Sequence, residues 1–196
     1  MNKKNFIITI FLALITWFVS YYITGQILNN KNKANEIVRN YNFDSIKDEE
    51  IRNLAKILIG SKVSDLNLKT VNNDFINLKN LKGEKYILEF ASTTCEACNE
   101  TVETLDMLEK KYSDIKFIKI FPTEDITAIN NFYKKHNLNV PNYVIAGQDN
   151  RQIDFFSEFN IKFYPTLLFV KDGYIVEMHV GTLDENLFKH KMNALK

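Results

Sequence analysis

The two cysteines of the chain, Cys95 and Cys98, lie in the stretch FASTTCEACNE with two residues between them. Cysteines at positions i and i+3 lie on one face of a helix, so their sulfurs can meet at disulfide distance with little backbone movement. At the start of a helix, the unpaired backbone N–H groups favour the thiolate of Cys95, while Cys98 is better shielded. The spacing therefore predicts that Cys95 exchanges with a partner's disulfide and Cys98 resolves the mixed disulfide.

A purely structural disulfide, or a buried thiol pair, is the alternative explanation of this spacing. A disulfide across two intervening residues closes a very short loop and therefore restrains the unfolded chain little. A redox role explains better why the two thiols lie together. If they are the working pair, the chain has no further thiol that an oxidising compartment could modify, which favours a location outside the cytoplasm.

The elements on either side of the cysteines fit this role. Residues 86–90, YILEF, form an apolar run suited to a buried strand. After the pair, Val102, Leu105 and Leu108 recur at helical spacing. A strand that ends just before a C-x-x-C pair, with a helix starting at the pair, makes the redox interpretation more specific.

The rest of the chain alternates strands and helices, which predicts an α/β fold with a mixed sheet. Residues 63–68 and 75–78 flank VNND and predict a hairpin, and Lys171-Asp172-Gly173 predicts a second, tight one. The remaining strands are expected over 115–121, 142–145, 166–170 and 174–180, and the remaining helices over 126–136, 153–159 and 183–195.

Residues 6–23 form an uninterrupted run without a charged side chain. As a helix this run would be about 27 Å long, close to the hydrocarbon thickness of a bilayer. No A-x-A-like cleavage site follows it, so residues 1–28 are predicted to be an uncleaved signal anchor; a cleaved signal peptide is the alternative. Lys3 and Lys4 precede the run and Lys31 and Lys33 follow it, which leans slightly toward a cytoplasmic N-terminus.

Residues 29–59 are expected to connect this anchor to the main domain. Residues 29–42 are polar and rich in Asn and Lys, as in a membrane-proximal spacer. Ser45 and Asp48 resemble a capping box, and Ile51, Leu54 and Leu58 recur at helical spacing, which predicts an amphipathic helix over about 45–59. The main domain is then expected to cover residues 60–196.

Composition excludes several other classes of protein. A hydrophobic content of 45% with 25% charged residues describes a globular chain, and a net charge of +1 gives no argument for nucleic-acid binding. The three histidines are far apart in the sequence, and with two cysteines they make a poor set of metal ligands. We therefore expect no metal and no cofactor apart from the redox-active disulfide.

The stretch YILEFASTTCEACNETVETL, followed by FYPTLLFVKDGYIV, resembles the thioredoxin-fold thiol–disulfide oxidoreductases. The preceding SKVSDLNLKTVNNDFINLKNLKGEKYILEF resembles the membrane-anchored TlpA/ResA-type branch, and the likeness covers about residues 60–196. The resemblance implies a thioredoxin-like fold, a central mixed sheet flanked by helices, with an N-terminal hairpin extension. It also implies a bacterial, single-pass membrane enzyme whose domain lies outside the cytoplasm. Its partners would be cysteine-containing exported proteins and a membrane or extracytoplasmic redox partner.

The resemblance further implies substrate-binding residues at the second motif. The family's proline matches Pro165, is cis, and faces the disulfide. The turn would present the backbone of Tyr164 beside the sulfurs, where an extended substrate peptide can add as a strand.

Two charged residues match positions near the family's disulfide. Glu89 stands where thioredoxins carry a buried acid, six residues before Cys95. A carboxyl there could accept and return the proton of Cys98, provided that burial raises its pKa toward neutrality. Lys119 stands where thioredoxins place a lysine near that acid, as a support for the proton relay.

Glu96, between the cysteines, matches an acidic residue of some ResA-type proteins and is expected, with Tyr164 and Pro165, among the substrate-binding residues. Its charge opposes the Cys95 thiolate and would make the disulfide less oxidising, which leans toward a reductant; a solvated acid at a helix start is the alternative. An oxidase that installs disulfides and a peroxiredoxin are rival enzymes. A non-catalytic accessory or chaperone in peptide export is the rival from another class.

Overall fold

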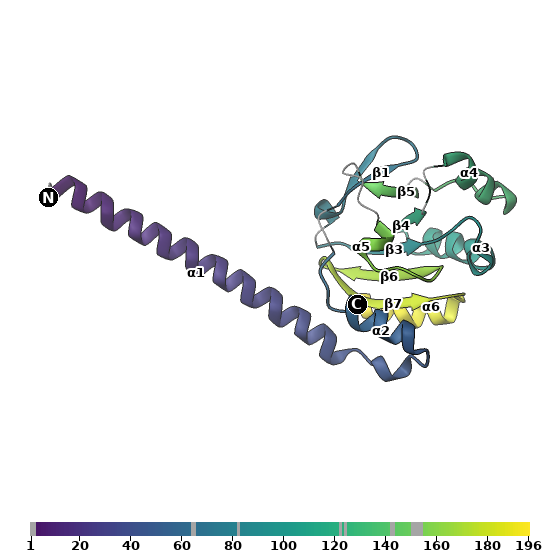
Figure 1. The fold of residues 1–196 in the computed structure, drawn as a ribbon, viewed down its shortest axis with the longest axis horizontal. Coiled ribbons are helices and arrows are strands. Elements are labelled where there is room, and N and C mark those ends of the chain that lie inside the picture. The colour runs from purple at the N-terminus through teal and green to yellow at the C-terminus, as the bar shows by residue number, and fades with distance from the viewer. Residues whose placement is uncertain are drawn as a thin grey trace.

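A single mixed sheet with helices on both faces forms the body of the molecule (Figure 1). The computed structural model describes residues 3–63, 66–81, 83–121, 123, 125–141, 144–149 and 155–196. In these residues seven strands form the sheet. The predicted α/β fold with a mixed sheet is confirmed, and it is thioredoxin-like.

The bounds of the elements agree closely with the sequence pattern around the cysteines. The strands are β1 (Asn67–Thr70), β2 (Phe75–Asn77), β3 (Lys85–Phe90), β4 (Lys116–Phe121), β5 (Val144–Asp149), β6 (Thr166–Lys171) and β7 (Tyr174–Val180). In the sheet they lie in the order β2-β1-β5-β4-β3-β6-β7. The helices are α1 (Lys3–Asn40), α2 (Glu49–Leu58), α3 (Glu96–Lys111), α4 (Ile126–Lys135), α5 (Phe155–Glu158) and α6 (Glu185–Met192). Short 3₁₀ turns occupy Phe43–Ser45, Leu78–Leu81 and Asn193–Leu195.

Both predicted hairpins are present, with one shifted strand. β1 begins at Asn67 rather than at residue 63, and it pairs with β2 in antiparallel register. Asp172 and Gly173 both have positive φ, 55° and 79°, as a two-residue turn between twisted strands requires. Of the strand expected over 142–145 and the helix expected over 153–159, residues 142–143 and 153–154 lie outside the described residues.

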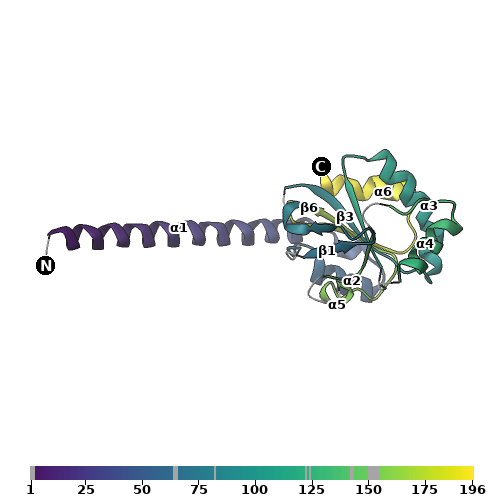
Figure 2. The same ribbon diagram turned by 90° about the horizontal axis from the view of Figure 1, so that it is seen from above.

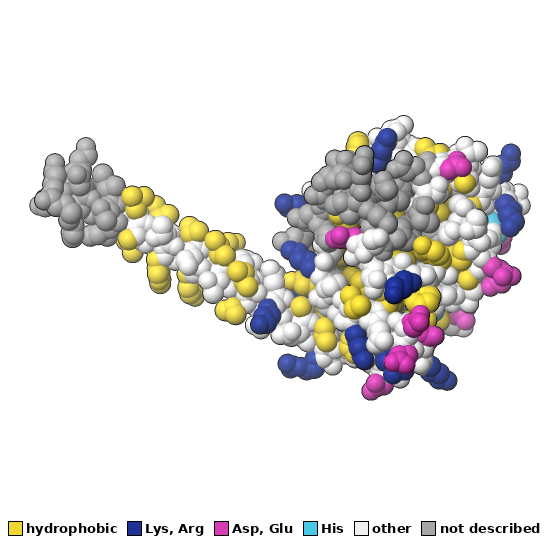
Figure 3. Space-filling view, in the orientation of Figure 1, with side chains coloured by type: hydrophobic (Ala, Val, Ile, Leu, Met, Phe, Trp, Pro, Cys, Tyr) yellow, Lys and Arg dark blue, Asp and Glu magenta, His cyan; other side chains and the backbone are white. Residues whose placement is uncertain are grey.

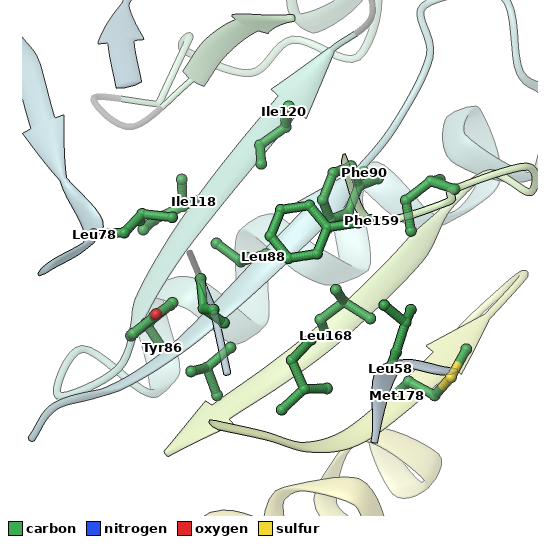
Figure 4. Packing of buried hydrophobic residues seen from close by; sticks show 14 of the residues in the cluster. Leu58, Leu78, Tyr86, Leu88, Phe90, Ile118, Ile120, Phe159, Leu168 and Met178 are labelled. Atoms are coloured by element: carbon green, nitrogen blue, oxygen red, sulfur yellow. The ribbon is translucent and has the colours of Figure 1, made fainter. Parts of the chain in front are cut away.

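The central strand β3 lies between β4, to which it is parallel, and β6, to which it is antiparallel. Because side chains alternate along a strand, β3 serves two cores. Its even-numbered residues pack with residues of α2 and with Phe159, which follows α5, in one large apolar cluster (Figure 4) that also includes Leu58, Tyr86 and Leu88. Its odd-numbered residues face the side covered by α3, α4 and α6 (Figure 2).

The N-terminal helix α1 extends away from the domain, and exposed apolar side chains lie along it between Phe11 and Leu28 (Figure 3). Among the described residues, it is the helix long and apolar enough to cross a membrane; its apolar window has a mean hydropathy of 1.5 and is not buried. The expected spacer over 29–42 is not a separate segment, because the helix continues to Asn40. The continuation is explained by Ile37 and Tyr41, which pack against the domain core.

The end of α1 is fixed to the domain by polar contacts and by a close approach. Lys33 Nζ lies 2.7 Å from Asp172 Oδ2, and Tyr41 Oη donates to Glu177 Oε1 at 2.9 Å. Gly60, at φ +80°, leaves room for this helix, since a Cβ there would lie 2.6 Å from a methyl group of Val38.

The amphipathic helix begins later than the sequence predicted. The capping role falls to Asp48, whose carboxylate accepts from Ile51 N at 2.9 Å, and α2 starts at Glu49. Ser45 does not cap it: the Ser45 hydroxyl donates to Asn42 O at 2.7 Å within the preceding turn. The helix packs on the domain, because Leu54 and Leu58 belong to the large apolar cluster.

Candidate active site

Cys95 and Cys98 form a disulfide at the N-terminus of α3, directly after the loop that leaves β3. Their Cα atoms are 5.2 Å apart. Cys95 is the N-cap residue, and its Sγ accepts a hydrogen bond from Cys98 N at 3.0 Å. Cys95 is half-buried, whereas Cys98 is only 3% exposed. The helix terminus therefore favours a thiolate on the accessible sulfur and shields the other one.

The turn before β6 lies against this disulfide. The Tyr164–Pro165 peptide bond is cis, as the family resemblance implies, and the carbonyl oxygen of Tyr164 lies 3.4 Å from Cys95 Sγ. Pro165 is buried, and its own carbonyl oxygen accepts from Gly181 N at 2.9 Å. The structure thus brings together Cys95, Cys98, Tyr164 and Pro165, which lie about 70 residues apart in the chain.

Glu89 is buried on β3, on the face that α3 covers, with 5% of its surface exposed. Burial raises the pKa of its carboxyl from 4.5 to about 7, and the charge of Glu109 adds to this, while Lys119 acts in the opposite direction. Within the described residues its buried Oε2 atom receives no hydrogen bond. A carboxyl in this setting titrates near neutral pH, which suits proton exchange.

Lys119 is the neighbour of Glu89 on the adjacent parallel strand β4. Its side chain is 1% exposed, and its Nζ lies 2.6 Å from Oε2 of Glu109 on α3. The predicted proximity to the acid is therefore present, but the ion pair is made with a different carboxylate. Sequence reasoning missed Glu109; the available signal was that a lysine in an apolar strand needs a counterion.

Glu96 lies in the first turn of α3 and is exposed. It follows Cys95 directly in the chain, and its effect on the Cys95 thiolate stays a prediction.

Asn99, one turn after Cys95, is a further residue of the site that sequence reasoning missed. Its Nδ2 donates to the backbone carbonyl of Cys95 at 2.7 Å. Its Oδ1 lies 3.1 Å from His136 Nε2 and 3.2 Å from Lys135 Nζ. Asn99 therefore links the first turn of α3 to the end of α4, and its position four residues after Cys95 was the signal for it.

Among the described residues no three His, Cys, Asp or Glu side chains are grouped so that they could hold an ion.

A disulfide at a helix start, opposed by a cis-proline turn on a mixed sheet, is the site of a thioredoxin-like thiol–disulfide oxidoreductase. The chain belongs to the Redoxin family, whose model matches residues 58–195.

Two curated relatives agree with this assignment. The chain is 26% identical over 141 residues to the thioredoxin-like protein YneN of Bacillus subtilis, covering 68% of this chain and 78% of the relative. It is 26% identical over 140 residues to the thiol-disulfide oxidoreductase ResA of the same species, covering 70% and 75%.

Two solved structures share the fold. A putative thiol:disulfide interchange protein DsbE from Chlorobium tepidum superposes with a TM-score of 0.58 at 18% identity, covering 69% of this chain and 96% of that one. StoA from Bacillus subtilis superposes with a TM-score of 0.53 at 19% identity, covering 64% and 94%.

Proposed function

We propose that this protein is a membrane-anchored thiol–disulfide oxidoreductase that reduces disulfides of exported proteins outside the cytoplasm. The observation that carries the proposal is the placement of Cys95: it caps α3, is accessible, and lies 3.4 Å from the backbone of the Tyr164–Pro165 turn. A substrate peptide lying along this turn would bring its own disulfide to the nucleophile.

The reaction has two exchange steps. In the reduced protein, the Cys95 thiolate attacks one sulfur of the substrate disulfide; a mixed disulfide forms and the other substrate sulfur leaves as a thiolate. The Cys98 sulfur then attacks Cys95 Sγ, so the Cys95–Cys98 disulfide forms and the second substrate thiolate leaves. The substrate gains two electrons and the protein loses them. A membrane or extracytoplasmic redox partner with a dithiol returns them.

Glu89 has the role of moving the proton in the second step. Cys98 must lose its proton before it attacks, and a buried thiol has little access to water. The Glu89 carboxyl is buried on the face of the sheet beneath α3, and its pKa of about 7 lets it accept that proton at neutral pH.

The charge of Glu96 supports electron transfer from this protein to the substrate disulfide. Glu96 follows Cys95 in the first turn of α3, where a carboxylate opposes the thiolate and so disfavours the reduced form. This lowers the midpoint potential and suits a reductant. A measured value near −270 mV or below would support this direction, and one near −120 mV would contradict it and support the rival oxidase.

Helix α1 supports the proposed membrane anchor and the proposed location of the domain outside the cytoplasm. A helix of this length whose apolar part is not buried is unlike the core helix of a globular domain. The C-terminal end of α1 contacts Asp172, which directly follows the last residue of β6. The first residue of β6, Thr166, directly follows the cis-proline. The disulfide would therefore lie at the end of the domain opposite its contact with α1, where soluble partners could reach it.

The anchor can be tested in cells. The full-length protein should stay in the membrane fraction after extraction at alkaline pH, and protease added outside the cytoplasmic membrane should digest its domain. Release by alkali or protection from the protease would overturn this part of the proposal.

Catalysis is tested with the full-length protein in detergent. Wild type should accelerate insulin reduction by dithiothreitol, and Cys95→Ser should fall to the uncatalysed rate. If Cys95→Ser kept the rate of wild type, the oxidoreductase proposal would fail and the non-catalytic accessory would be favoured.

A further inference from the structure

Three charged side chains lie between α3 and the sheet. They are Glu89 on β3, Lys119 on β4 and Glu109 on α3. Glu89 and Lys119 are partners in the parallel ladder, so their side chains leave the same face of the sheet. They are 5% and 1% exposed. The group therefore holds two carboxyl groups and a single ammonium in a largely buried place.

Among the described residues, Lys119 is the cation whose charge acts on the Glu89 carboxyl. Across the other ladder Glu89 is the partner of Leu167 on β6, which is apolar. From α4 it is approached by Tyr133, whose phenol stays neutral because burial raises its pKa. From α3 it is approached by Glu109, whose charge acts on it. Lys119 is thus the cation for which the two carboxyl groups compete.

In the structure the Lys119 ammonium pairs with one of the two carboxyl groups, that of Glu109. Lys119 Nζ lies 2.6 Å from Glu109 Oε2, whereas Oε2 of Glu89 has no hydrogen-bond donor in the part of the chain that the structure describes. We propose that Glu109 is a positioning residue for proton transfer at Glu89: by holding the Lys119 ammonium, it keeps that cation from becoming the counterion of Glu89. The inference rests on the proposed function, in which Glu89 takes the proton of Cys98.

The electrostatics of Glu89 support this division. After burial, which is the largest cause, Lys119 lowers the pKa of Glu89 and Glu109 raises it. Removing the charge of Glu109 should therefore favour the Glu89 carboxylate, and removing the charge of Lys119 should disfavour it. Opposite shifts from two members of one ion pair are the signature of positioning, since a purely structural pair would weaken the fold without moving a titration.

The experiment measures the second exchange step against pH in the full-length protein in detergent. Reduced protein is mixed with a peptide disulfide, quenched in acid, and the decay of the mixed disulfide is followed by mass spectrometry from about pH 5 to pH 9. Glu109→Gln should move the midpoint of the profile down by about one pH unit, and Lys119→Met should move it up by a similar amount. Glu100→Gln, which removes one charge from an exposed position of the same helix, should leave it unchanged.

Midpoints that stay in place in both variants, or that move in the same direction, would overturn the inference. Lys119→Met decides independently if Glu109→Gln folds poorly, since an unshifted midpoint there excludes a shared cation. Glu89→Gln separates this result from the proposed function. If that variant keeps the wild-type profile, the role of Glu89 itself fails; if it abolishes the profile while the Glu109 and Lys119 variants do not shift it, only this inference fails.

Discussion

Neighbouring residues of β3 alternate between its two faces. One face buries apolar side chains, and the other buries a charged one. Leu88 and Phe90 point into the apolar cluster between the sheet and α2 (Figure 4). Glu89, between them, points toward α3, and so does Lys119 from the next strand. Both buried charged side chains of the described residues thus lie on the side that also carries Cys98.

This difference shows how one strand can serve stability and chemistry at once. A buried charge is costly and is tolerated where a partner or a reaction requires it. Because side chains alternate, the cost stays on the α3 face, while the α2 face is packed for stability. Substitutions on the two faces should therefore affect different properties.

Leu88→Ala should give the largest change in stability. Leu88 is fully buried on the α2 face, and removing its side chain leaves a cavity, so the free energy of unfolding should fall by about 2–5 kcal/mol. Denaturant unfolding of the full-length protein in detergent measures this. Ile57→Ala, on the exposed side of α2, is the matched control and should change it by less than about 0.5 kcal/mol. Equal losses would contradict the packing described for this face.

Glu89→Gln should make stability less dependent on pH. In the folded protein the pKa of Glu89 is about 7 against an ordinary 4.5, so the folded state binds this proton more tightly. Its contribution is fully present below about pH 4.5 and is lost as the pH rises through 7. Relative to the variant, wild type should therefore lose about 3 kcal/mol between pH 4 and pH 8, at about 1.4 kcal/mol per pH unit. Parallel curves for the two proteins would show that Glu89 is not a buried, neutral acid.

Asp48→Ala should have the smallest effect of the three and belongs to the α2 face. It removes the side chain that accepts from Ile51 N, and the loss of an N-cap costs about 1 kcal/mol. The unfolding midpoint in denaturant measures it. Ser45→Ala, at the position that the sequence pattern favoured, should cost less; the reverse order would restore Ser45 as the start of the helix.

The sequence predicted the parts of the site that depend on local pattern. An apolar strand, a C-x-x-C pair and a helical periodicity define where Cys95 and Cys98 lie, and the resemblance supplied Pro165 and Glu89. What could not be predicted depends on tertiary contacts. Nothing in the pattern pairs Lys119 with Glu109, because that choice is made by the packing of α3 on β4.

The helices before the main domain were likewise only partly predictable from the sequence. Residues 29–42 have the composition of a loose spacer, and their helix is explained by apolar contacts of Ile37 and Tyr41 with the domain, which the linear sequence does not show. At α2, Ser45 and Asp48 are both good capping residues by type, but Asp48 caps the helix while Ser45 bonds to Asn42 within the preceding turn.

The most direct test of the account is to trap the mixed disulfide with each single-cysteine variant. Full-length Cys98→Ser, mixed with a peptide disulfide, should accumulate a covalent adduct on Cys95, because the accessible sulfur at the helix terminus attacks first and nothing resolves the product. Cys95→Ser should accumulate little adduct, since Cys98 is shielded. If mass spectrometry found the peptide on Cys98 as fast as on Cys95, the assigned roles of the two sulfurs would be wrong.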